Sequence, residues 1–325
     1  GTFYDFLENI NEIKNIFPNL VIEKKFSKSV NAEYIIIHGY DTISSWYCYF
    51  ASLLSNKKII WRGEVIERKT EDITLKSKII FNLKKHILPL YFSRCYKILY
   101  SCKPNKSFLS KYVIHRDKLI SFPCAVDNDF FKTYKITEIK KINSHKKSLS
   151  IPDSSIVITT CSRLTKRKRT SNIIESIAAS KYYEKIIFLI IGDGPEKNYL
   201  SKLSKNLGVN SIFLGFCDQE TIAKIHSLSN VFILFSIYDA SPKALNEALN
   251  FEQSIIVSDG IGTSNDLVKN EKNGYIVKNP LELTEKINYL CKDLNKTKNM
   301  GKYNSKILKK YCYDTDIQNL ITILN

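Results

Sequence analysis

Short apolar runs alternate with helix-length segments along most of this chain, and this alternation limits the folds that it can adopt. Residues 185–191, for example, are almost all apolar, which is typical of a strand buried on both faces of a sheet. Such strands separated by helices predict parallel sheets covered on both sides. The expected strands are residues 34–38, 57–61, 97–101, 119–122, 155–160, 185–191, 211–214, 231–235, 254–258 and 275–277. The expected helices include residues 43–54, 170–182, 196–207, 219–228, 242–250 and 281–290.

The length of 325 residues predicts two domains, each large enough to bury its own core. Because the alternation occurs in two series, we expect one Rossmann-like domain over residues 1–135 and a second over residues 154–310. Residues 136–153 are polar and rich in Lys, Ser and Asn, which indicates a linker. In doubly wound sheets, ligands bind beyond the carboxyl ends of the strands. Candidate binding residues should therefore follow the strands directly.

A net charge of +17, from 49 Lys and Arg against 32 Asp and Glu, indicates a polyanionic partner or surface. Residues 68–118 hold thirteen of these cations and only three acidic residues, interleaved with apolar side chains. That pattern fits a basic amphipathic helix on an anionic membrane surface and, equally, a solvated helix face. Nucleic acid is not expected as a partner, because no motif of a known nucleic-acid-binding module is present. A nucleic-acid-binding α/β protein stays as a remote alternative, supported only by the charge.

Two classes of protein are not supported by the sequence. No apolar run is long enough to span a bilayer, which excludes a polytopic membrane protein. The eight cysteines are scattered without a Cys-x-x-Cys pair, and no His cluster completes a zinc pattern. We therefore expect buried thiols rather than a metal centre.

Cations gather directly after the expected strand 155–160. Arg163 and Lys168 stand in a loop that contains three further cations, so five like charges repel one another there unless an anion is bound. Bidentate Arg and flexible Lys suit a diphosphate. A solvated basic loop is the alternative reading.

Two glycine turns also follow expected strands. Gly192-Asp193-Gly194 comes after residues 185–191 and leads into a helix, a pattern shared by many α/β proteins. Gly260 and Gly262 come after residues 254–258 and would let the backbone approach a ligand closely. Each turn alone indicates little, but both lie at the expected ligand-binding edge.

A further candidate follows the expected strand 231–235. A serine that can cap the next helix and a proline suited to its first turn leave free amides, which form an anion site favoured by the helix dipole. The residues concerned are Ser241, Pro242, Lys243 and Ala244. Glu247 lies further along that helix among apolar neighbours, where a carboxylate is costly unless it accepts hydrogen bonds. Ribose hydroxyls are suitable donors, and a salt bridge to a nearby Lys is the alternative.

Six motifs occur in order over residues 155–280: Ser162-Arg163-Leu164 with Lys168, Gly192–Glu196, Leu214-Gly215-Phe216, Asp239 with Glu247, Asp259 with Gly262, and Asn273–Val277. Together they resemble the donor domain of the family 4 glycosyltransferases, the retaining "glycosyl transferases group 1" with the GT-B fold. The resemblance implies two Rossmann-like domains whose parallel sheets face each other across a cleft. It implies an acceptor domain first, a nucleotide-sugar donor domain second, and a last helix, residues 311–325, that crosses back to the first domain.

The resemblance also implies roles for individual residues. Arg163 and Lys168 would neutralise the donor diphosphate, Glu247 would hold the ribose, and Asp239 would hold hydroxyls of the donor sugar. The further donor-binding candidates are Gly192, Asp193, Gly194, Phe216, Ser241, Pro242, Lys243 and Ala244, with Phe216 bordering the base. Two departures from the family stand out. Ser162 replaces the usual Gly, and Asp239 replaces the commoner Glu, which keeps the charge on a shorter arm.

The first half of the chain resembles the family's acceptor domain in fewer places. Arg62, Gly63 and Glu64 follow an expected strand where many family members place a His, and they are candidates for the cleft; an exposed salt bridge is the alternative. The family usually opens with a strand and a Gly-rich loop, whereas residues 2–17 have the pattern of a helix. Either the amino-terminal domain is built without that first strand and loop, or the chain, which begins with Gly1, is truncated.

The function that the resemblance implies is retaining, metal-independent transfer of a sugar from a nucleoside-diphosphate sugar to a glycan or lipid-linked acceptor. The setting that it implies is bacterial surface polysaccharide or glycolipid assembly in the cytoplasm, at the inner face of the plasma membrane if the basic stretch binds lipid. No cofactor is expected. A catalytically incomplete nucleotide-sugar-binding protein or partner subunit of the same fold is the alternative.

Overall fold

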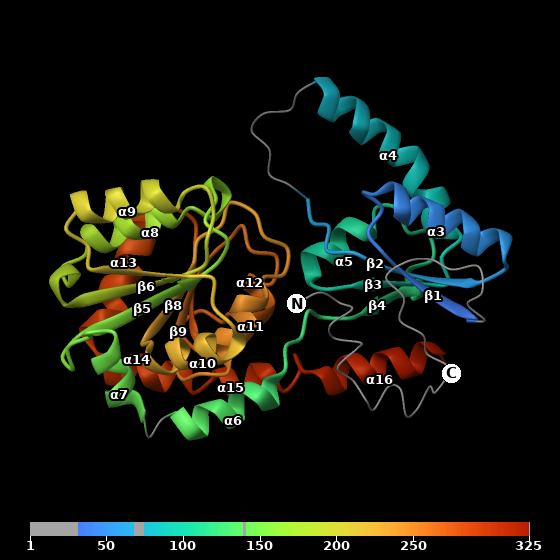
Figure 1. Cartoon of the computed structure of the whole chain (residues 1–325). Helices are drawn as coiled ribbons and strands as arrows, with labels where there is room; N and C mark the ends of the chain where they lie inside the picture. Colours follow the sequence, from blue (N-terminus) through green and yellow to red (C-terminus); the bar gives the residue numbers. More distant parts are fainter. Residues whose placement is uncertain (1–31, 68–74, 139–140, 325) are drawn as a thin grey trace. The chain divides into compact units, whose positions relative to one another are not determined.

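The computed structural model describes residues 32–67, 75–138 and 141–324, and the chain forms two compact units (Figure 1). Unit 1 comprises Gly1–Phe122 with Asp316–Asn325, and unit 2 comprises Pro123–Thr315. Each unit is built on one sheet, and every pairing between the described strands of these sheets is parallel. The predicted class, two parallel α/β domains in series, is therefore confirmed.

Unit 1 has a four-stranded sheet in the order β1-β2-β3-β4. Because successive right-handed crossovers run in one direction, they place the connecting helices on the same face of the sheet. The strands are β1 (Tyr34–His38), β2 (Lys58–Arg62), β3 (Lys97–Tyr100) and β4 (Leu119–Ser121). The connections contain α3 (Ile43–Leu54), α4 (Leu75–Ser93), α5 (Lys103–Leu109) and the short η1 (Arg116–Lys118).

The core of unit 1 is aromatic. The Trp61 ring on β2 meets Phe92 of α4 edge-on at 5.0 Å between ring centroids, and both side chains are fully buried. The last helix, α16 (Tyr313–Leu324), also joins unit 1, since Asn319 Nδ2 donates to the Ser121 carbonyl at 2.9 Å. The helix expected over residues 2–17, and with it the question of an initial strand and Gly-rich loop, lies outside the described residues.

Unit 2 has a six-stranded sheet in the order β10-β9-β8-β5-β6-β7. From β5 the chain first builds outward through β6 and β7, and then returns to add β8, β9 and β10 on the other side of β5. This is the doubly wound order, whose topological switch point lies between β5 and β8. The strands are β5 (Ile156–Cys161), β6 (Ile186–Ile191), β7 (Ser211–Gly215), β8 (Val231–Leu234), β9 (Ser254–Ser258) and β10 (Gly274–Val277).

Helices cover both faces of this sheet, as the uniformly apolar strands predict. One face packs against α8 (Thr170–Ala178), α9 (Lys197–Asn206) and α13 (Pro280–Lys292). The other face packs against α10 (Gln219–Leu228) and α11 (Lys243–Leu249). The remaining helical segments are η3 (Lys166–Lys168), η4 (Tyr183–Lys185), α12 (Ser264–Leu267), α14 (Leu294–Gly301) and α15 (Asn304–Leu308).

The segment expected to be a linker, residues 136–153, differs from that expectation. It contains the end of α6 (Asn128–Glu138) and all of α7 (Ile142–Ser148), and both helices belong to unit 2. Ile142 and Leu149 pack against the core that covers β5 and β6. Ser144, Lys147 and Ser148 of α7 are exposed, and such a polar composition is typical of a linker as well as of a helix surface.

Close backbone contacts require glycine at the turn after β6. A Cβ atom on Gly192 would lie 2.0 Å from the Ser162 carbonyl oxygen, and one on Gly194 would lie 2.3 Å from that of Leu164. Gly192 also has a φ of +125°, which L side chains rarely adopt. With glycine at both positions, the turn after β6 can pack directly against the basic loop that follows β5.

We expect Gly192→Ala to lower the free energy of unfolding by about 2–3 kcal/mol, because the added methyl group overlaps a carbonyl and strains φ. Gly208→Ala is the matched control. Gly208 has a φ of +66° but open space around its Cβ, so its replacement should cost only about 1 kcal/mol. Urea unfolding followed by circular dichroism measures both variants. Equal losses would show that the close contact at Gly192 does not matter.

Candidate functional site

The loops after β5 and β8 meet at the switch point of unit 2. The chain leaves β5 toward α8 on one face of the sheet and leaves β8 toward α11 on the other face. A crevice beyond the strand ends is where doubly wound sheets bind their ligands. Arg163 and Lys168 lie in the first of these loops, and Asp239 and Ser241 lie in the second.

An ion pair joins the two loops. Lys168 Nζ binds the carboxylate of Asp239, and both side chains are largely buried, at 12% and 17% exposed. Backbone contacts support the pair: Ile237 N donates to the Arg167 carbonyl at 2.9 Å, and the Arg167 guanidinium donates to the Tyr238 carbonyl. The structure thus brings together two of the four predicted catalytic residues, 71 positions apart in the chain.

The loop after β9 holds Asp239 from its other side. Asp239 N donates to the Gly260 carbonyl at 3.1 Å, and Gly262 N donates to the Asp239 carbonyl at 2.8 Å. A Cβ on Gly260 would lie 2.2 Å from the Ile237 carbonyl oxygen. Gly260 and Gly262 were expected to let the backbone approach a ligand. In the structure, Gly260 lies close to the backbone of the loop that carries Asp239, and the approach to a ligand stays a prediction.

Glu247, the third predicted catalytic residue, lies on α11 with a partly buried carboxylate. It makes no hydrogen bond or ion pair with any residue that the structure describes. Burial raises the pKa of Glu247, and the charge of Lys243 opposes this only in part. The Glu247 charge in turn helps burial to raise the pKa of Cys161, the last residue of β5. The carboxylate therefore lies near the switch point and lacks donors there.

Buried hydroxyls also lie without partners around this edge. Ser241 makes no capping hydrogen bond to α11, contrary to the prediction, and its Oγ has no partner among the described residues. The buried hydroxyls of Ser236, after β8, and Thr263, after β9, also lack a partner among the described residues. Sequence analysis missed these two residues, although their places just beyond strand ends were a usable signal. Unpaired buried hydroxyls favour a polar ligand.

Arg163, the fourth predicted catalytic residue, is exposed and has no hydrogen-bond partner within the described part of the chain. Its loop lies against the turn after β6, because Leu164 N donates to the Asp193 carbonyl at 2.9 Å. The Asp193 carboxylate accepts from Lys197 and from Gly194 N, and these bonds lower its pKa, Lys197 most. Asp193 thus belongs to its own turn, and this turn positions Arg163.

Phe216 lies just beyond β7, at the edge of the sheet, and is 90% exposed. Because this aromatic ring is not packed against the protein, it is available to stack on a planar ligand. Pro242, Lys243 and Ala244 lie at the start of α11, beside Ser241.

In unit 1, the ends of β1 and β2 form a second polar cluster. Arg62 is only 5% exposed, so the alternative of an exposed salt bridge is wrong. Its Nη1 donates to Glu64 Oε1 at 3.1 Å and contacts His38 Nε2 at 3.1 Å. His38 was not predicted, although it is paired in register with Arg62. Burial, with the Arg62 charge, lowers the pKa of His38. Gly63 lies directly over the Trp61 ring.

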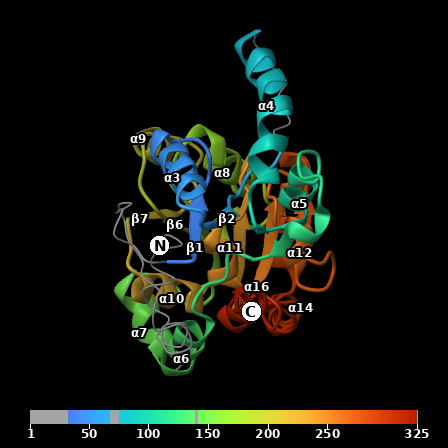
Figure 2. The same cartoon turned by 90° about the vertical axis from the view of Figure 1, so that its right-hand side faces the viewer.

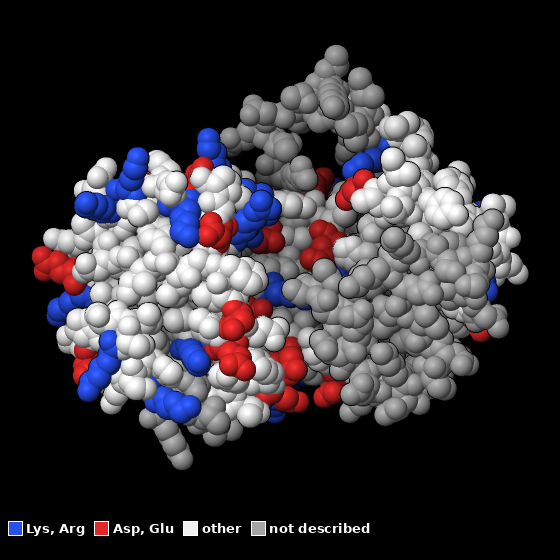
Figure 3. Space-filling model, in the orientation of Figure 1, with Lys and Arg blue, Asp and Glu red and all other residues white. Residues whose placement is uncertain are grey.

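On the side shown in Figure 3, the Lys and Arg side chains of unit 2 are interspersed with Asp and Glu. Among the described residues, no group of three or more His, Cys, Asp and Glu could hold a metal ion. In the same part of the chain, no helix has the length and apolar character needed to cross a bilayer.

Residues 141–307, just over half of the chain, match the model of the family described as glycosyl transferases group 1. The chain belongs to this family. The match confirms the resemblance that the six motifs carried, and it covers the whole switch-point site of unit 2.

Two curated relatives place this group 1 chain among glycosyltransferases of different organisms. It is 30% identical over 166 residues to the Escherichia coli UDP-Gal:alpha-D-GlcNAc-diphosphoundecaprenol alpha-1,3-galactosyltransferase, covering 49% of this chain and 41% of the relative. It is 29% identical over 145 residues to an uncharacterized glycosyltransferase of Methanocaldococcus jannaschii, covering 43% and 37%. The aligned part is thus about two fifths of the length of these curated relatives.

The fold also matches solved structures. Anabaena HepE in complex with UDP and glucose superimposes with a TM-score of 0.72 at 17% identity, covering 89% of this chain and 77% of HepE. At that identity the likeness concerns the fold alone. It agrees with the predicted GT-B class of two Rossmann-like domains.

The raised pKa of Glu247 predicts a gain in stability when its charge is removed. An acid with a raised pKa in the folded state binds protons more tightly there than in the unfolded chain, so stability falls as pH rises above the unfolded pKa. We expect Glu247→Gln to raise the free energy of unfolding at pH 7. It should also remove the part of the decrease in stability with rising pH that is due to Glu247. Urea unfolding at pH 4 and pH 7 measures it, with Glu285→Gln on the exposed side of α13 as the control. A destabilised Glu247→Gln would show that the carboxylate is already satisfied.

Proposed function

We propose that this chain transfers a sugar from a nucleoside-diphosphate sugar to a hydroxyl group of a glycan or lipid-linked acceptor. The observation that carries the proposal is the Lys168–Asp239 ion pair at the switch point of unit 2, with Glu247 and three unpaired buried hydroxyls around it. A site that combines unpaired acceptors and donors with a preplaced cation suits a polyhydroxylated, negatively charged ligand.

Lys168 and Arg163 bind the donor diphosphate in this proposal. The Lys168 ammonium has three donors and uses one on Asp239, so the others remain for phosphate oxygens. Asp239 therefore fixes the direction of a flexible side chain before any ligand arrives. Arg163 is exposed at the rim and supplies a planar fork that fits two phosphate oxygens.

Glu247 and Asp239 bind the two sugar rings of the donor. Glu247 accepts hydrogen bonds from the ribose diol, which supplies the donors that its partly buried carboxylate lacks. Asp239 accepts from a hydroxyl of the transferred sugar with the carboxylate oxygen that does not face Lys168. Ser241 and the start of α11 lie next to the phosphates, and Phe216 stacks on the base.

The reaction needs no protein nucleophile, cofactor or metal in this proposal. The bond between the sugar C1 and the diphosphate oxygen breaks, and its electron pair stays on that oxygen. Lys168 and Arg163 stabilise the growing charge, which is where preplaced cations contribute most. The acceptor oxygen bonds to C1 on the same face, so configuration is retained, and its proton passes to the departing diphosphate.

The acceptor site is proposed in unit 1, at the strand ends that carry Arg62, Gly63 and Glu64. The name of the Escherichia coli relative specifies a sugar linked to diphosphoundecaprenol as its acceptor. A lipid-linked acceptor in surface glycan assembly, on the cytoplasmic side of the membrane, is accordingly our proposal for this chain.

A thermal-shift screen with UDP, GDP, ADP and CMP tests the donor site. One nucleoside diphosphate should raise the melting temperature, because a ligand at a hundredfold excess over its Kd adds about 2.7 kcal/mol of stability. Lys168→Ala should lose most of that shift, whereas Lys166→Ala, an exposed cation of the same loop, should keep it. A flat screen on folded protein would reject the donor site.

Turnover tests the transfer step. With the nucleoside-diphosphate sugar that the screen selects and an undecaprenyl-diphosphate-linked GlcNAc acceptor, Lys168→Ala and Glu247→Ala should each lower kcat/KM by about 100-fold or more. Release of the nucleoside diphosphate measures it, and Lys166→Ala serves as the control. Unchanged turnover in either variant would contradict the assigned roles. Tight nucleotide binding without turnover on glycan or lipid-linked acceptors would instead favour a catalytically incomplete nucleotide-sugar-binding protein.

A further inference from the structure

Helix α3 in unit 1 carries an exposed apolar stripe. Ile43 and Leu54 are 89% and 90% exposed, and Tyr47 and Phe50 between them are more than half exposed. The spacing of four, three and four residues places all of them on one side of the helix. The opposite side packs into the core through Tyr49. The outer side of a surface helix is normally polar, yet α3 contains no charged residue.

Helix α4 continues this apolar face. Leu83, Ile87 and Leu90 are exposed at the same helical spacing, whereas Leu88 and Tyr91 on the other side are buried. The helices contact one another through Tyr49 of α3 and Tyr91 of α4, whose rings stack with centroids 4.0 Å apart. Figure 2 shows α4 extending well beyond α3. We call the exposed apolar residues of the two helices the α3–α4 face: Ile43, Tyr47, Phe50, Leu54, Leu83, Ile87 and Leu90.

Cations border the α3–α4 face and acidic residues are missing around it. The sequence contains no Asp or Glu over residues 42–63 or over residues 73–116, and the second stretch contains ten Lys and Arg. Lys85, in the middle of α4, and Arg94, at its end, are exposed, whereas the Lys84 ammonium lies over the Tyr40 ring, 5.1 Å from its centroid. The side chains of residues 68–81 lie outside the part of the chain that the structure describes.

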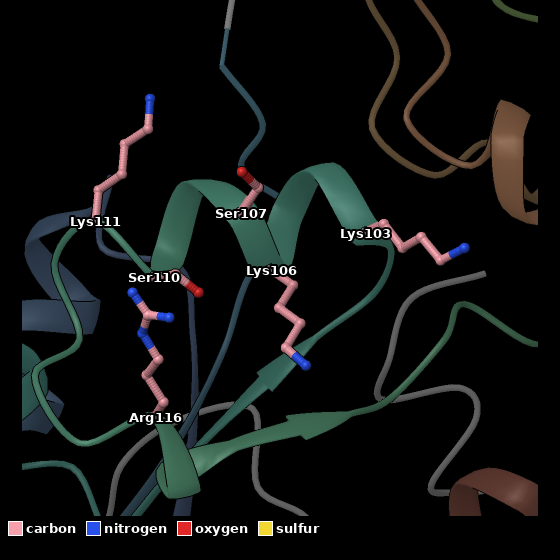
Figure 4. Close-up of a pocket in the computed structure, with 6 residues that line it drawn as sticks. All are labelled: Lys103, Lys106, Ser107, Ser110, Lys111 and Arg116. Atoms are coloured by element: carbon pink, nitrogen blue, oxygen red, sulfur yellow. The ribbon is translucent and has the colours of Figure 1, made fainter.

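Helix α5, the third helix of the same layer, adds a cationic hollow. Its volume is about 460 Å³, and it is lined by four cations and two serines (Figure 4): Lys103, Lys106, Ser107, Ser110, Lys111 and Arg116. Figure 4 shows Arg116 reaching from η1 toward the end of α5 that carries Ser110. Lys111 is paired with Glu67 at 2.7 Å. Positive side chains around hydroxyl groups suit a phosphate group.

The stretch of residues 68–118, whose pattern fits a basic amphipathic helix, contains α4, α5 and also β3, which lies where a strand was expected over residues 97–101. Its apolar residues divide between the core and the surface, and Lys118 donates to the Ser93 and Cys95 carbonyls. The amphipathic surface instead spans two helices, one of which lies outside that stretch.

The combination of charge and exposed apolar residues distinguishes between three partners that could cover the α3–α4 face: a second copy of this chain, nucleic acid and a lipid bilayer. A second copy of this chain would bring its own cations against these cations, which costs free energy. Nucleic acid would meet the cations but leave the apolar stripe unused. An anionic bilayer matches both features, because apolar side chains enter the acyl boundary while Lys and Arg meet lipid phosphates.

We propose that the α3–α4 face lies on the surface of an anionic lipid bilayer, with the cations of α4 and α5 at the lipid phosphates. This interaction goes beyond sugar transfer, since it requires neither donor nor turnover. It would hold unit 1 at the surface where a lipid-linked acceptor resides, so that the acceptor diffuses to the site in two dimensions.

Co-sedimentation with vesicles tests the proposal. The wild-type chain should pellet with vesicles of phosphatidylglycerol and phosphatidylcholine in equal parts, and at least tenfold less with pure phosphatidylcholine. Added salt should weaken the binding, because it screens the charges. Ile43→Ser/Leu54→Ser keeps the net charge and removes the two most exposed apolar side chains, so it should bind at least tenfold less well. The control is Leu281→Ser, the same change at an exposed leucine of α13 in unit 2, which should bind as the wild type does.

The charge contribution is tested separately. Lys85→Gln/Arg94→Gln should lose the dependence on phosphatidylglycerol, whereas Lys202→Gln/Lys205→Gln on α9 of unit 2 should not. Failure of the wild type to bind, or wild-type binding by Ile43→Ser/Leu54→Ser, would overturn the proposal. So would a dimer, detected by sedimentation velocity, that this variant abolishes while vesicle binding persists. Nucleotide-induced thermal shifts in the same variants should be unchanged, which separates this outcome from failure of the donor site.

Discussion

The ion pair between Lys168 and Asp239 is the interaction on which the site of unit 2 depends. It joins the loop after β5 to the loop after β8, the two strands between which the sheet reverses its order. Two largely buried charges are stable there only as a pair, because removing either leaves the other desolvated. The pair therefore does two things in the free protein. It ties the two loops to each other, and it holds an ammonium group in the place where a diphosphate would need it.

Backbone packing around the pair explains why glycines recur at the strand ends. Gly192 and Gly194 lie against the carbonyls of the basic loop, and Gly260 lies against the carbonyl of Ile237. A Cβ at any of these three positions would overlap the neighbouring carbonyl. Because glycine has none, the turns after β6 and β9 can pack directly against the loops after β5 and β8. These turns thus support the loops that contain the charged residues. The same geometry accounts for Asp193, whose carboxylate is used within its own turn while its carbonyl holds the Arg163 loop.

The sequence was sufficient to predict the elements, since runs such as β6 and β9 are apolar throughout and their neighbours have helical spacing. It also placed the charged candidates after strands, where the structure has them. It failed where the answer depends on packing between distant segments. The polar residues of α7 face solvent, so their composition resembled a linker. His38 meets Arg62 only through the register of β1 and β2, and Ser236 and Thr263 become unpaired hydroxyls only once their strands are neighbours. The exposed stripe of α3 could not be predicted either, because a sequence does not show which side of a helix lacks a packing partner.

Polar groups without partners cost stability, and several of those in unit 2 lie just beyond the ends of its strands. Glu247 has a raised pKa, and the hydroxyls of Ser236, Ser241 and Thr263 are buried without a described partner. A sequence selected for stability alone would replace them with apolar residues or pair them with one another, since each unpaired buried group costs about 1–3 kcal/mol. Because they follow β8 and β9, at the strand ends where doubly wound sheets bind ligands, we infer that a ligand supplies the missing partners. A ligand that satisfied these groups would recover that cost on binding, so the same residues that weaken the free protein would strengthen its complex.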